Sequence, residues 1–423
     1  MPNRLLTTIL LTIVVCCAGL TVGCVYDDDQ AAPSDLAPGP EADSARAVDR
    51  PFVPLADEPP PVAELIAQGK AALNERDAQT AHEKFLRAIV FDADNSDAAC
   101  GLVLADGIIV LDALVALPGQ LEDPAMPGKS GGIGENLQRV VQTSLLPPLY
   151  EMLAMIKITQ NDPHFSFWLE HYPLIIDGDT WLFDLGKEWD AADMIAARGY
   201  TYMLLGLSDT LLSLEADFNW HTVFNWDYGF GGDIDQMIIN ICDLLIVLLT
   251  DEDYPNFLRL NQEGATLLPK AGIEWGRGLR DLGLCLDLAR AESDFQGDDV
   301  FGYIDENGNH AWDVDERMHV PYFGDLTDAG TVTLSLFQYY SQGIGASFLD
   351  GTDEDIDPDN PNLWNLNELD MLSFHLGLGL PLFDLEIDFG QFFRDAQPDG
   401  LHTTLLLLAD LIKEALEADG GVR

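Results

Sequence analysis

Long apolar stretches at helical spacing are the feature that most limits how this chain can fold. In each of them apolar residues recur every three to four positions, over lengths that strands seldom reach. These stretches cover residues 138–158, 191–218, 234–249, 265–290, 331–348 and 401–418. Asp190 and Asp233 directly precede two of them, where N-cap residues stand. Strand-like pieces, such as 174–176 and 382–389, are short. The sequence therefore predicts a mainly α fold with long acidic loops.

Residues 62–117 predict three further helices, at 62–74, 78–91 and 97–117, with a short polar turn between the first two. The small and aromatic residues inside the first two helices are Gly69, Ala72, Ala81, Phe85 and Ala88. Their spacing resembles the tetratricopeptide repeat, in which small residues let two antiparallel helices approach and an aromatic ring packs across them. A generic helical hairpin is the alternative. Only about one and a half repeats are present, so this unit is expected to lean on the rest of the chain.

The first residues form an export signal. Arg4 precedes the apolar run 5–15, and small residues lead to Cys24. The order Leu20-Thr21-Val22-Gly23-Cys24 resembles the bacterial lipoprotein box, with Thr21 where that family usually has leucine. The resemblance implies that residues 1–23 are removed and that Cys24 is acylated as the mature N-terminus. An ordinary secretory peptide cut nearby is the alternative.

The remaining chain divides by composition into a tether and a body. Residues 24–60 are rich in Asp, Ala and Pro, and such a segment buries too little apolar surface to offset the entropy of ordering. A Gly/Pro-rich connector at 118–134 then separates the repeat-like hairpin, 61–117, from a large helical domain, 134–423. We expect a body that stands off the bacterial cell envelope on a lipid-anchored tether, at the outer membrane or the cell surface.

The chain is strongly acidic. It holds 72 Asp and Glu against 21 Lys and Arg, a formal net charge of −51, which becomes −52 when residues 1–23 are removed with Arg4. Such a surface repels nucleic-acid phosphates and anionic lipid headgroups, so neither is an expected partner. Adaptation to a salty habitat and functional cation binding both explain the charge, and its even spread favours the first.

One acidic segment, residues 305–316, has oxygen-bearing side chains at the first, third, fifth, ninth and twelfth places. It resembles the EF-hand calcium loop, although His310 replaces that family's glycine and Pro321 disfavours a following helix. The resemblance implies a bare calcium loop rather than a paired sensor. Its predicted ligands are the side chains of Asp305, Asn307 and Asn309, the carbonyl of Ala311, a water held by Asp313, and both oxygens of Glu316. A solvated turn is the alternative.

Other clusters carry weaker chemical signals. The acidic loop 350–361 fits no calcium register and is interpreted as a linker. Aromatic residues beside acids, at 168–171, 188–190 and 219–228, are typical of carbohydrate sites but also of core anchors at helix ends. Cys100, Cys242 and Cys285 lie in apolar patterns as buried thiols, with a Cys242–Cys285 bridge as the alternative.

These features together favour a non-enzymatic, lipid-anchored helical scaffold or binding protein of the cell envelope, with a structural Ca²⁺ ion and a protein partner. The runner-up is a secreted helical glycan-active hydrolase that uses paired carboxylates and stacking aromatic rings. Whether the chain is an enzyme stays open, and the sequence favours a non-enzymatic role. It lacks the motifs of serine hydrolases, P-loop enzymes and zinc proteases.

Overall fold

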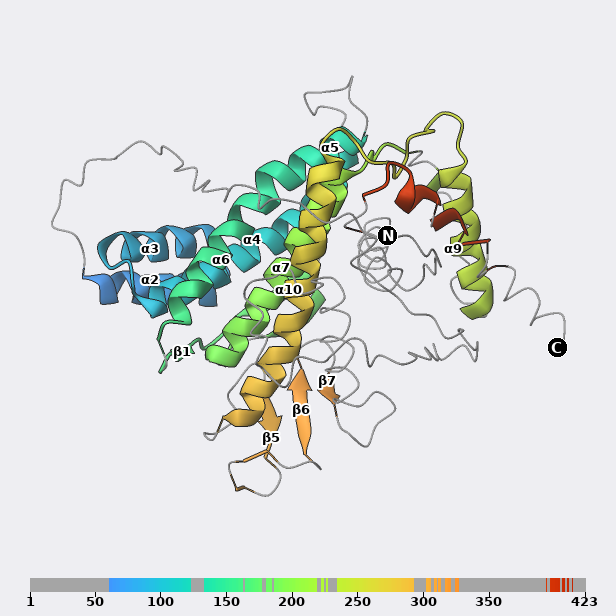
Figure 1. The fold of residues 1–423 in the computed structure, drawn as a ribbon. Helices are drawn as coiled ribbons and strands as arrows, with labels where there is room; N and C mark the ends of the chain where they lie inside the picture. The colour runs from blue at the N-terminus through green and yellow to red at the C-terminus, as the bar shows by residue number, and fades with distance from the viewer. Residues whose placement is uncertain are drawn as a thin grey trace, which may run out of the picture.

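A computed structural model shows a mainly helical protein, as the sequence predicts (Figure 1). The residues it describes are 61–122, 133–162, 164–176, 180–184, 186–218, 222–223, 226, 234–292, 302–305, 308–309, 311–312, 316–320, 324–326, 393, 396–403, 405–407, 409–410 and 413. The signal, the tether, Asp233, the loop 350–361 and the stretches predicted at 331–348 and 382–389 lie outside the described residues.

The helices are α2 (Val62–Asn74), α3 (Ala78–Phe91), α4 (Ser96–Glu122), α5 (Ile133–Val140), the π-helical turn η1 (Val141–Leu145), α6 (Leu146–Thr159), α7 (Ala191–Ser213), α9 (Ile234–Leu249) and α10 (Gly264–Ala291). The strands are β1 (Phe167–Trp168), β2 (Pro173–Ile176), β3 (Thr180–Asp184), β4 (Glu188–Trp189), β5 (Gly302–Ile304), β6 (Arg317–Val320) and β7 (Gly324–Leu326). The described strands pair antiparallel, as β1–β4, β2–β3 and β5–β6–β7.

The N-terminal helices α2, α3 and α4 pack around one phenylalanine. A Cβ added at Gly69 of α2 or at Gly101 of α4 would lie 2.6 Å or 2.2 Å from the ring of Phe85. Both glycines therefore leave the space that this fully buried ring fills. Asp77 caps α3 by accepting a hydrogen bond from the Thr80 amide. The bounds of α2 and α3 are those predicted, and the resemblance to a tetratricopeptide repeat stays a resemblance.

Helix α4 differs from its prediction at the C-terminal end. It continues through Pro118 to Glu122, although a proline inside a helix removes a backbone donor and its ring crowds the preceding turn. The connector therefore begins later than expected. The segment Ser96–Leu117 is long and apolar enough to cross a membrane, but 56% of its most apolar window is buried inside the fold. It packs against α3 and α6, so we interpret it as a core helix.

The single helix predicted at 138–158 is divided in the structure. The π-turn η1 separates α5 from α6, and Pro147 and Pro148 follow at the start of α6. Two successive residues without backbone N–H groups interrupt the α-helical hydrogen bonds, and the widened turn lies directly before them. Local periodicity does not show such a turn because it leaves the apolar spacing almost unchanged.

Helices α7 and α10 cross the middle of the molecule as a closely packed pair (Figure 1). A Cβ at Gly278 of α10 would lie 2.8 Å from the carbonyl oxygen of Gly199 of α7, so glycine lets the two backbones meet. Beside this contact, Arg198 donates two hydrogen bonds, of 2.6 and 2.9 Å, to the fully buried carboxylate of Asp281. Asp190 forms the predicted cap of α7, as part of a capping box.

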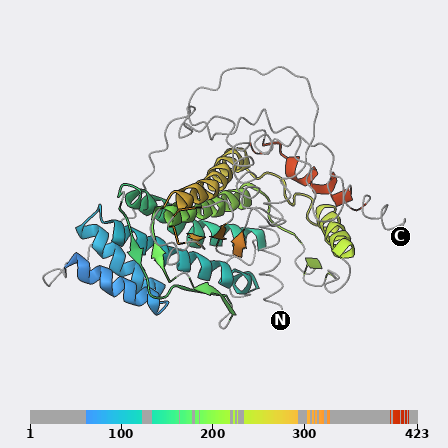
Figure 2. The same ribbon diagram turned by 90° about the horizontal axis from the view of Figure 1, so that it is seen from below.

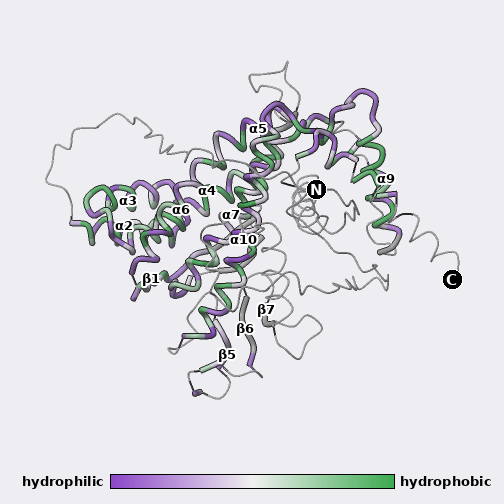
Figure 3. Tube along the Cα trace, viewed as in Figure 1, coloured by the Kyte–Doolittle hydropathy of each residue, from purple (hydrophilic) through white to green (hydrophobic). Residues whose placement is uncertain are grey.

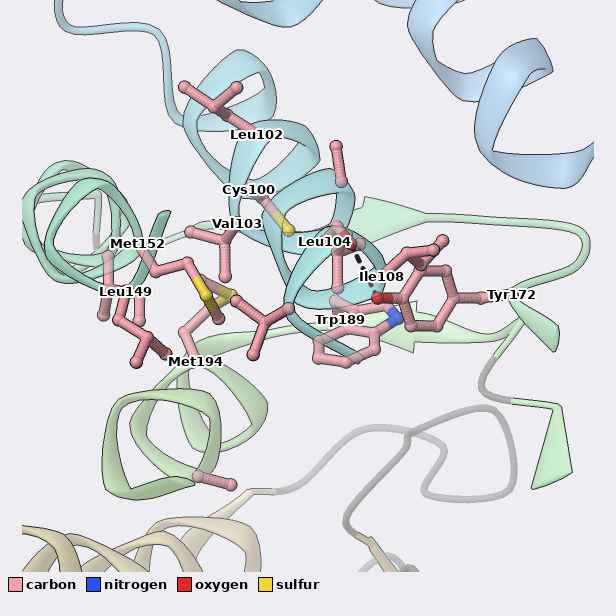
Figure 4. Packing of buried hydrophobic residues seen from close by; sticks show 14 of the residues in the cluster. Cys100, Leu102, Val103, Leu104, Ile108, Leu149, Met152, Tyr172, Trp189 and Met194 are labelled. Carbon is pink, nitrogen blue, oxygen red and sulfur yellow. Dashed lines mark hydrogen bonds between the residues drawn. The ribbon is translucent and has the colours of Figure 1, made fainter. Parts of the chain in front are cut away.

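One main core joins the predicted hairpin to the larger domain. It contains Leu65 of α2, Leu149 of α6 and Met194 of α7. Figure 4 shows its centre, where Tyr172 donates a 2.7 Å hydrogen bond to the carbonyl of Leu104. The hairpin thus leans on the rest of the chain, as its short length predicts.

Helix α9 belongs to a second, smaller core. Figures 1 and 2 both place it at the opposite end of the molecule from α2 and α3, and Figure 3 marks its apolar residues in green. It packs with helical residues near 400–413. Lys413 forms a 2.5 Å ion pair with Asp243 across this contact.

The three cysteines of the body, Cys100, Cys242 and Cys285, are buried, and none of them forms a disulfide. The interpretation as buried thiols is therefore confirmed, and Cys242 and Cys285 form no bridge. Burial raises the pKa of the Cys100 and Cys285 thiols. Neither thiol is therefore ready to react as a thiolate.

Candidate functional site

The predicted calcium loop, residues 305–316, joins two antiparallel strands. Strand β5 leads into it and β6 leads out, and Ile304 pairs with Arg317 at its base. The flanking helices of an EF-hand are thus replaced by a β-hairpin. This arrangement fixes the two ends of the loop close together, since paired strands lie about 5 Å apart.

Hydrogen bonds wrap the start of this loop around Asp305. Its Oδ1 accepts from the amides of Gly308, at 2.6 Å, and Asn309, at 3.2 Å. Asn309 in turn accepts a 2.8 Å hydrogen bond from the amide of Ala311. Gly308 adopts a φ of +72°, which a residue with a side chain rarely adopts, so glycine is favoured at this bend.

The six predicted ligands divide by what the structure describes. Asp305, Asn309, Ala311 and Glu316 are described, whereas Asn307 and Asp313 lie outside the described residues. Asn309 and Ala311 are exposed and Glu316 is buried. The calcium site therefore remains a prediction.

The loop is attached to the main core through Trp312. The Trp312 ring packs edge-on against buried Tyr303, with 5.8 Å between ring centroids. The guanidinium carbon of Arg290, at the end of α10, lies 5.5 Å from the centroid of the Trp312 ring. The hydroxyl of Tyr303 donates to the carbonyl of Glu292, at 3.4 Å. Order in the loop is thus coupled to packing at the C-terminal end of α10 (Figure 1).

A second polar cluster, which the sequence analysis missed, lies between α6, α7 and α10. We call Tyr150, Asp209, Lys270 and Glu274 the Lys270 cluster. The Lys270 ammonium donates to Asp209 and to the hydroxyl of Tyr150, both at 2.5 Å, and lies 3.4 Å from Glu274. Asp209 and Glu274 are buried, whereas Lys270 is 43% exposed. The i,i+4 spacing of Lys270 and Glu274 is visible in the sequence, but the partners on α6 and α7 are not.

The Lys270 cluster shifts the titration of its members. Burial, and then the neighbouring Asp209 carboxylate, raise the pKa of Glu274 to about 8, although Lys270 opposes the shift. Burial would lower the pKa of Lys270, but its hydrogen bond to Asp209 and the charge of Glu274 raise it overall. Glu274 is therefore largely protonated at neutral pH, while Lys270 is charged.

This arrangement differs from the carboxylate pair of a glycoside hydrolase. Such a pair stands on both sides of a sugar ring, about 5–10 Å apart. Here the ammonium of Lys270 lies between the two acids and forms an ion pair with both Asp209 and Glu274. The cluster thus neutralises itself at a helix interface and leaves no space for a sugar between its acids.

Some of the aromatic residues that the sequence places beside acids, at 168–171, 188–190 and 219–228, lie in the core. Trp189 is buried and packs edge-on against Tyr172, at 5.9 Å between centroids. Trp226 donates a 2.8 Å hydrogen bond to the carbonyl of Asn240. Trp168 is 51% exposed, and it pairs with Glu188 across β1 and β4. The anchoring interpretation therefore holds for Trp189 and Trp226, and Trp168 offers an exposed ring.

No protein-family model matches the chain, and neither a curated protein nor a solved structure is significantly similar to it. Its function therefore has to be inferred from its own sites and composition.

Proposed function

We propose that this chain is a lipid-anchored helical binding protein of the bacterial cell envelope, with Ca²⁺ as a structural ion of the loop at 305–316. The export signal with Cys24, the acidic tether and the helical body support this proposal. The role is non-enzymatic, acting on a protein partner in the envelope. The self-neutralised Lys270 cluster is in keeping with that role.

The attachment of the calcium loop to α10 is the observation that carries the proposal. Trp312 lies inside the loop and packs on Tyr303, which belongs to the main core. An ion that orders the loop would therefore stabilise the helical body as a whole, by its preference for the folded state. Calcium is plentiful outside the cell, where weak sites, with Kd on the order of 10⁻⁴ to 10⁻³ M, are filled.

Calcium-dependent stability tests the structural part of this proposal. Ca²⁺ should raise the melting temperature of chelator-treated protein more than Mg²⁺ does, because Mg²⁺ demands a small octahedral site. The double variant Asp305→Ala with Glu316→Ala should lose this difference. The double variant Glu252→Ala with Asp253→Ala, which removes two exposed acids from another turn, should keep it. An equal calcium response in all three proteins would refute the structural ion.

Lipidation and partner binding test the remaining part. Cys24→Ala should move the protein from the membrane to the soluble fraction and abolish labelling by a fatty-acid probe. Crosslinking in native membranes should then capture a protein partner with the parent chain. Unchanged membrane partition of the variant would refute the anchor.

The glycan-active alternative keeps one supporting observation, the exposed Trp168 ring beside Glu188. Stacking of a sugar on this ring would change its fluorescence. Titration with envelope oligosaccharides should therefore give a signal that Trp168→Ala removes. Hydrolysis of such a glycan, lost in Glu188→Gln, would replace the binding-protein proposal.

A further inference from the structure

Three side chains from separate helices meet at a position that neither the calcium loop nor the Lys270 cluster includes. They are His82 of α3, Asp106 of α4 and Glu151 of α6, which we call the His82 cluster. One imidazole nitrogen and one oxygen from each carboxylate all lie within 4.8 Å of one another. Helix α4 packs against both α3 and α6 (Figure 1). We propose that the His82 cluster binds a divalent transition-metal ion.

The setting of Asp106 supports this proposal. Asp106 is 1% exposed and lies in α4. Its neighbour Ala105 is fully buried, and a Cβ added at Gly107 would lie 3.2 Å from the hydroxyl oxygen of Tyr172. A carboxylate in such an apolar helix requires a strong partner, because burial removes its hydration. Nδ1 of His82 lies 2.8 Å from its Oδ1.

Charge balance favours a cation over a proton. The cluster carries two carboxylates and one imidazole. A protonated His82 would offset only one of these two carboxylates. A divalent ion would balance both carboxylates and leave the imidazole neutral, which is the form that ligates metals.

The donor set indicates which ion is bound. Imidazole suits zinc and its neighbours in the transition series, whereas Ca²⁺ prefers six to eight oxygens. Zn²⁺ binds nitrogen and oxygen donors at about 2.0–2.2 Å, which places tetrahedral donors about 3.3 Å apart. The His82 Nδ1 and Asp106 Oδ1 atoms are 2.8 Å apart, and all three donor atoms lie within 4.8 Å of one another, so these distances bracket this value. Side-chain rotations that move the donor atoms by about 1 Å would bring them to the tetrahedral spacing.

Access to solvent completes the argument. His82 is 13% exposed and Glu151 is partly exposed, so an ion can enter from the edge of the helix bundle. Three protein ligands leave a fourth tetrahedral position for water or a small anion. This site differs from the calcium loop in place, ligands and ion, and it stands whether or not that loop binds calcium.

Cobalt and zinc titration of the mature protein tests the proposal. Chelator-treated protein is titrated in excess Ca²⁺, which occupies weak acidic surface sites. One Co²⁺ per chain should give the visible absorption of a four-coordinate nitrogen–oxygen site, and Zn²⁺ should displace it. A thiolate charge-transfer band would instead assign the ion to a cysteine and overturn the proposal.

Matched variants locate the ion. His82→Gln and Glu151→Gln should each weaken binding by more than about tenfold, since removing even an outer-shell partner costs that much. Glu83→Gln and His164→Gln change exposed residues outside the cluster and should bind as the parent does. Circular dichroism confirms that each variant is folded.

Two further results would overturn the proposal. One is the absence of stoichiometric binding in the parent. The other is parental affinity in folded Glu151→Gln or folded His82→Gln. The calcium-loop double variant should retain the cobalt signal, so failure of the calcium site and failure of this site are distinguishable.

Discussion

Glu274 of the Lys270 cluster makes stability depend on pH around neutrality. Its pKa is raised from 4.5 to about 8 in the folded protein, where it is buried beside Asp209. The folded state therefore holds this proton more tightly than the unfolded chain does. Protonated Glu274 therefore stabilises the folded state fully at pH values below 4.5. This stabilisation is lost as the pH rises from 4.5 to about 8, and above about 8 the loss is complete.

The size of the effect follows from that window. Each pH unit inside it lowers the free energy of unfolding by about 1.4 kcal/mol. From about pH 5 to 7, ionisation of Glu274 should therefore lower the free energy of unfolding by roughly 2 to 3 kcal/mol. Glu274→Gln keeps the shape of the side chain but cannot ionise. The free energy of unfolding of the variant, relative to that of the parent, should therefore increase by roughly 2 to 3 kcal/mol over the same pH interval.

Denaturant unfolding followed by circular dichroism, at fixed Ca²⁺ and salt, measures this difference at each pH. Glu263→Gln supplies the control, because Glu263 is an exposed acid at the start of the same helix. Its curve should stay parallel to that of the parent. Parallel curves for Glu274→Gln as well would refute the argument, since the carboxyl would then titrate alike in the folded and unfolded chains.

Three further predictions concern packing and charge. Phe85→Ala should lower the free energy of unfolding by about 3–5 kcal/mol in denaturant titrations, because the ring fills the space left by two glycines, while Phe91→Ala at a 38% exposed position should cost much less. Arg198→Met should lower the free energy of unfolding by about 3–5 kcal/mol, because it leaves the fully buried Asp281 without its bidentate partner. In a double-mutant cycle, adding Asp281→Met to this variant should recover much of that loss. The melting temperature of the chain, whose formal net charge is −51, should rise with NaCl as the Debye length falls from ~30 Å at 0.01 M to ~3 Å at 1 M. A flat profile would mean that its charges are already balanced locally.

Where helices form was largely readable from the sequence. The bounds of α2, α3 and α9 match their apolar periods, and Asp77 and Asp190 cap the helices that follow them. These features depend on neighbours within one or two turns, which the sequence itself specifies. The same local pattern indicated that Cys100 and Cys285 would be buried.

The sequence marked residues 305–316 as a candidate calcium loop, which stays a prediction, but it did not indicate the surroundings of this segment. Strands β5 and β6 flank it, and Trp312 packs on the end of α10. The pairing of β6 with β7 as well as with β5 makes this hairpin part of a three-stranded sheet. Such pairing depends on contacts between strands, and short strands carry little periodic signal of their own.

Only the tertiary structure decided which polar residues meet. Asp209 and Lys270 are 61 residues apart, and His82 and Asp106 are 24 apart, yet each pair is in hydrogen-bond contact. The rotation and crossing of packed helices bring such residues together, and these follow from side-chain packing across α3, α4, α6, α7 and α10 rather than from any local pattern. Short segments of this chain therefore determine where helices form, whereas the buried polar clusters arise from the way those helices pack.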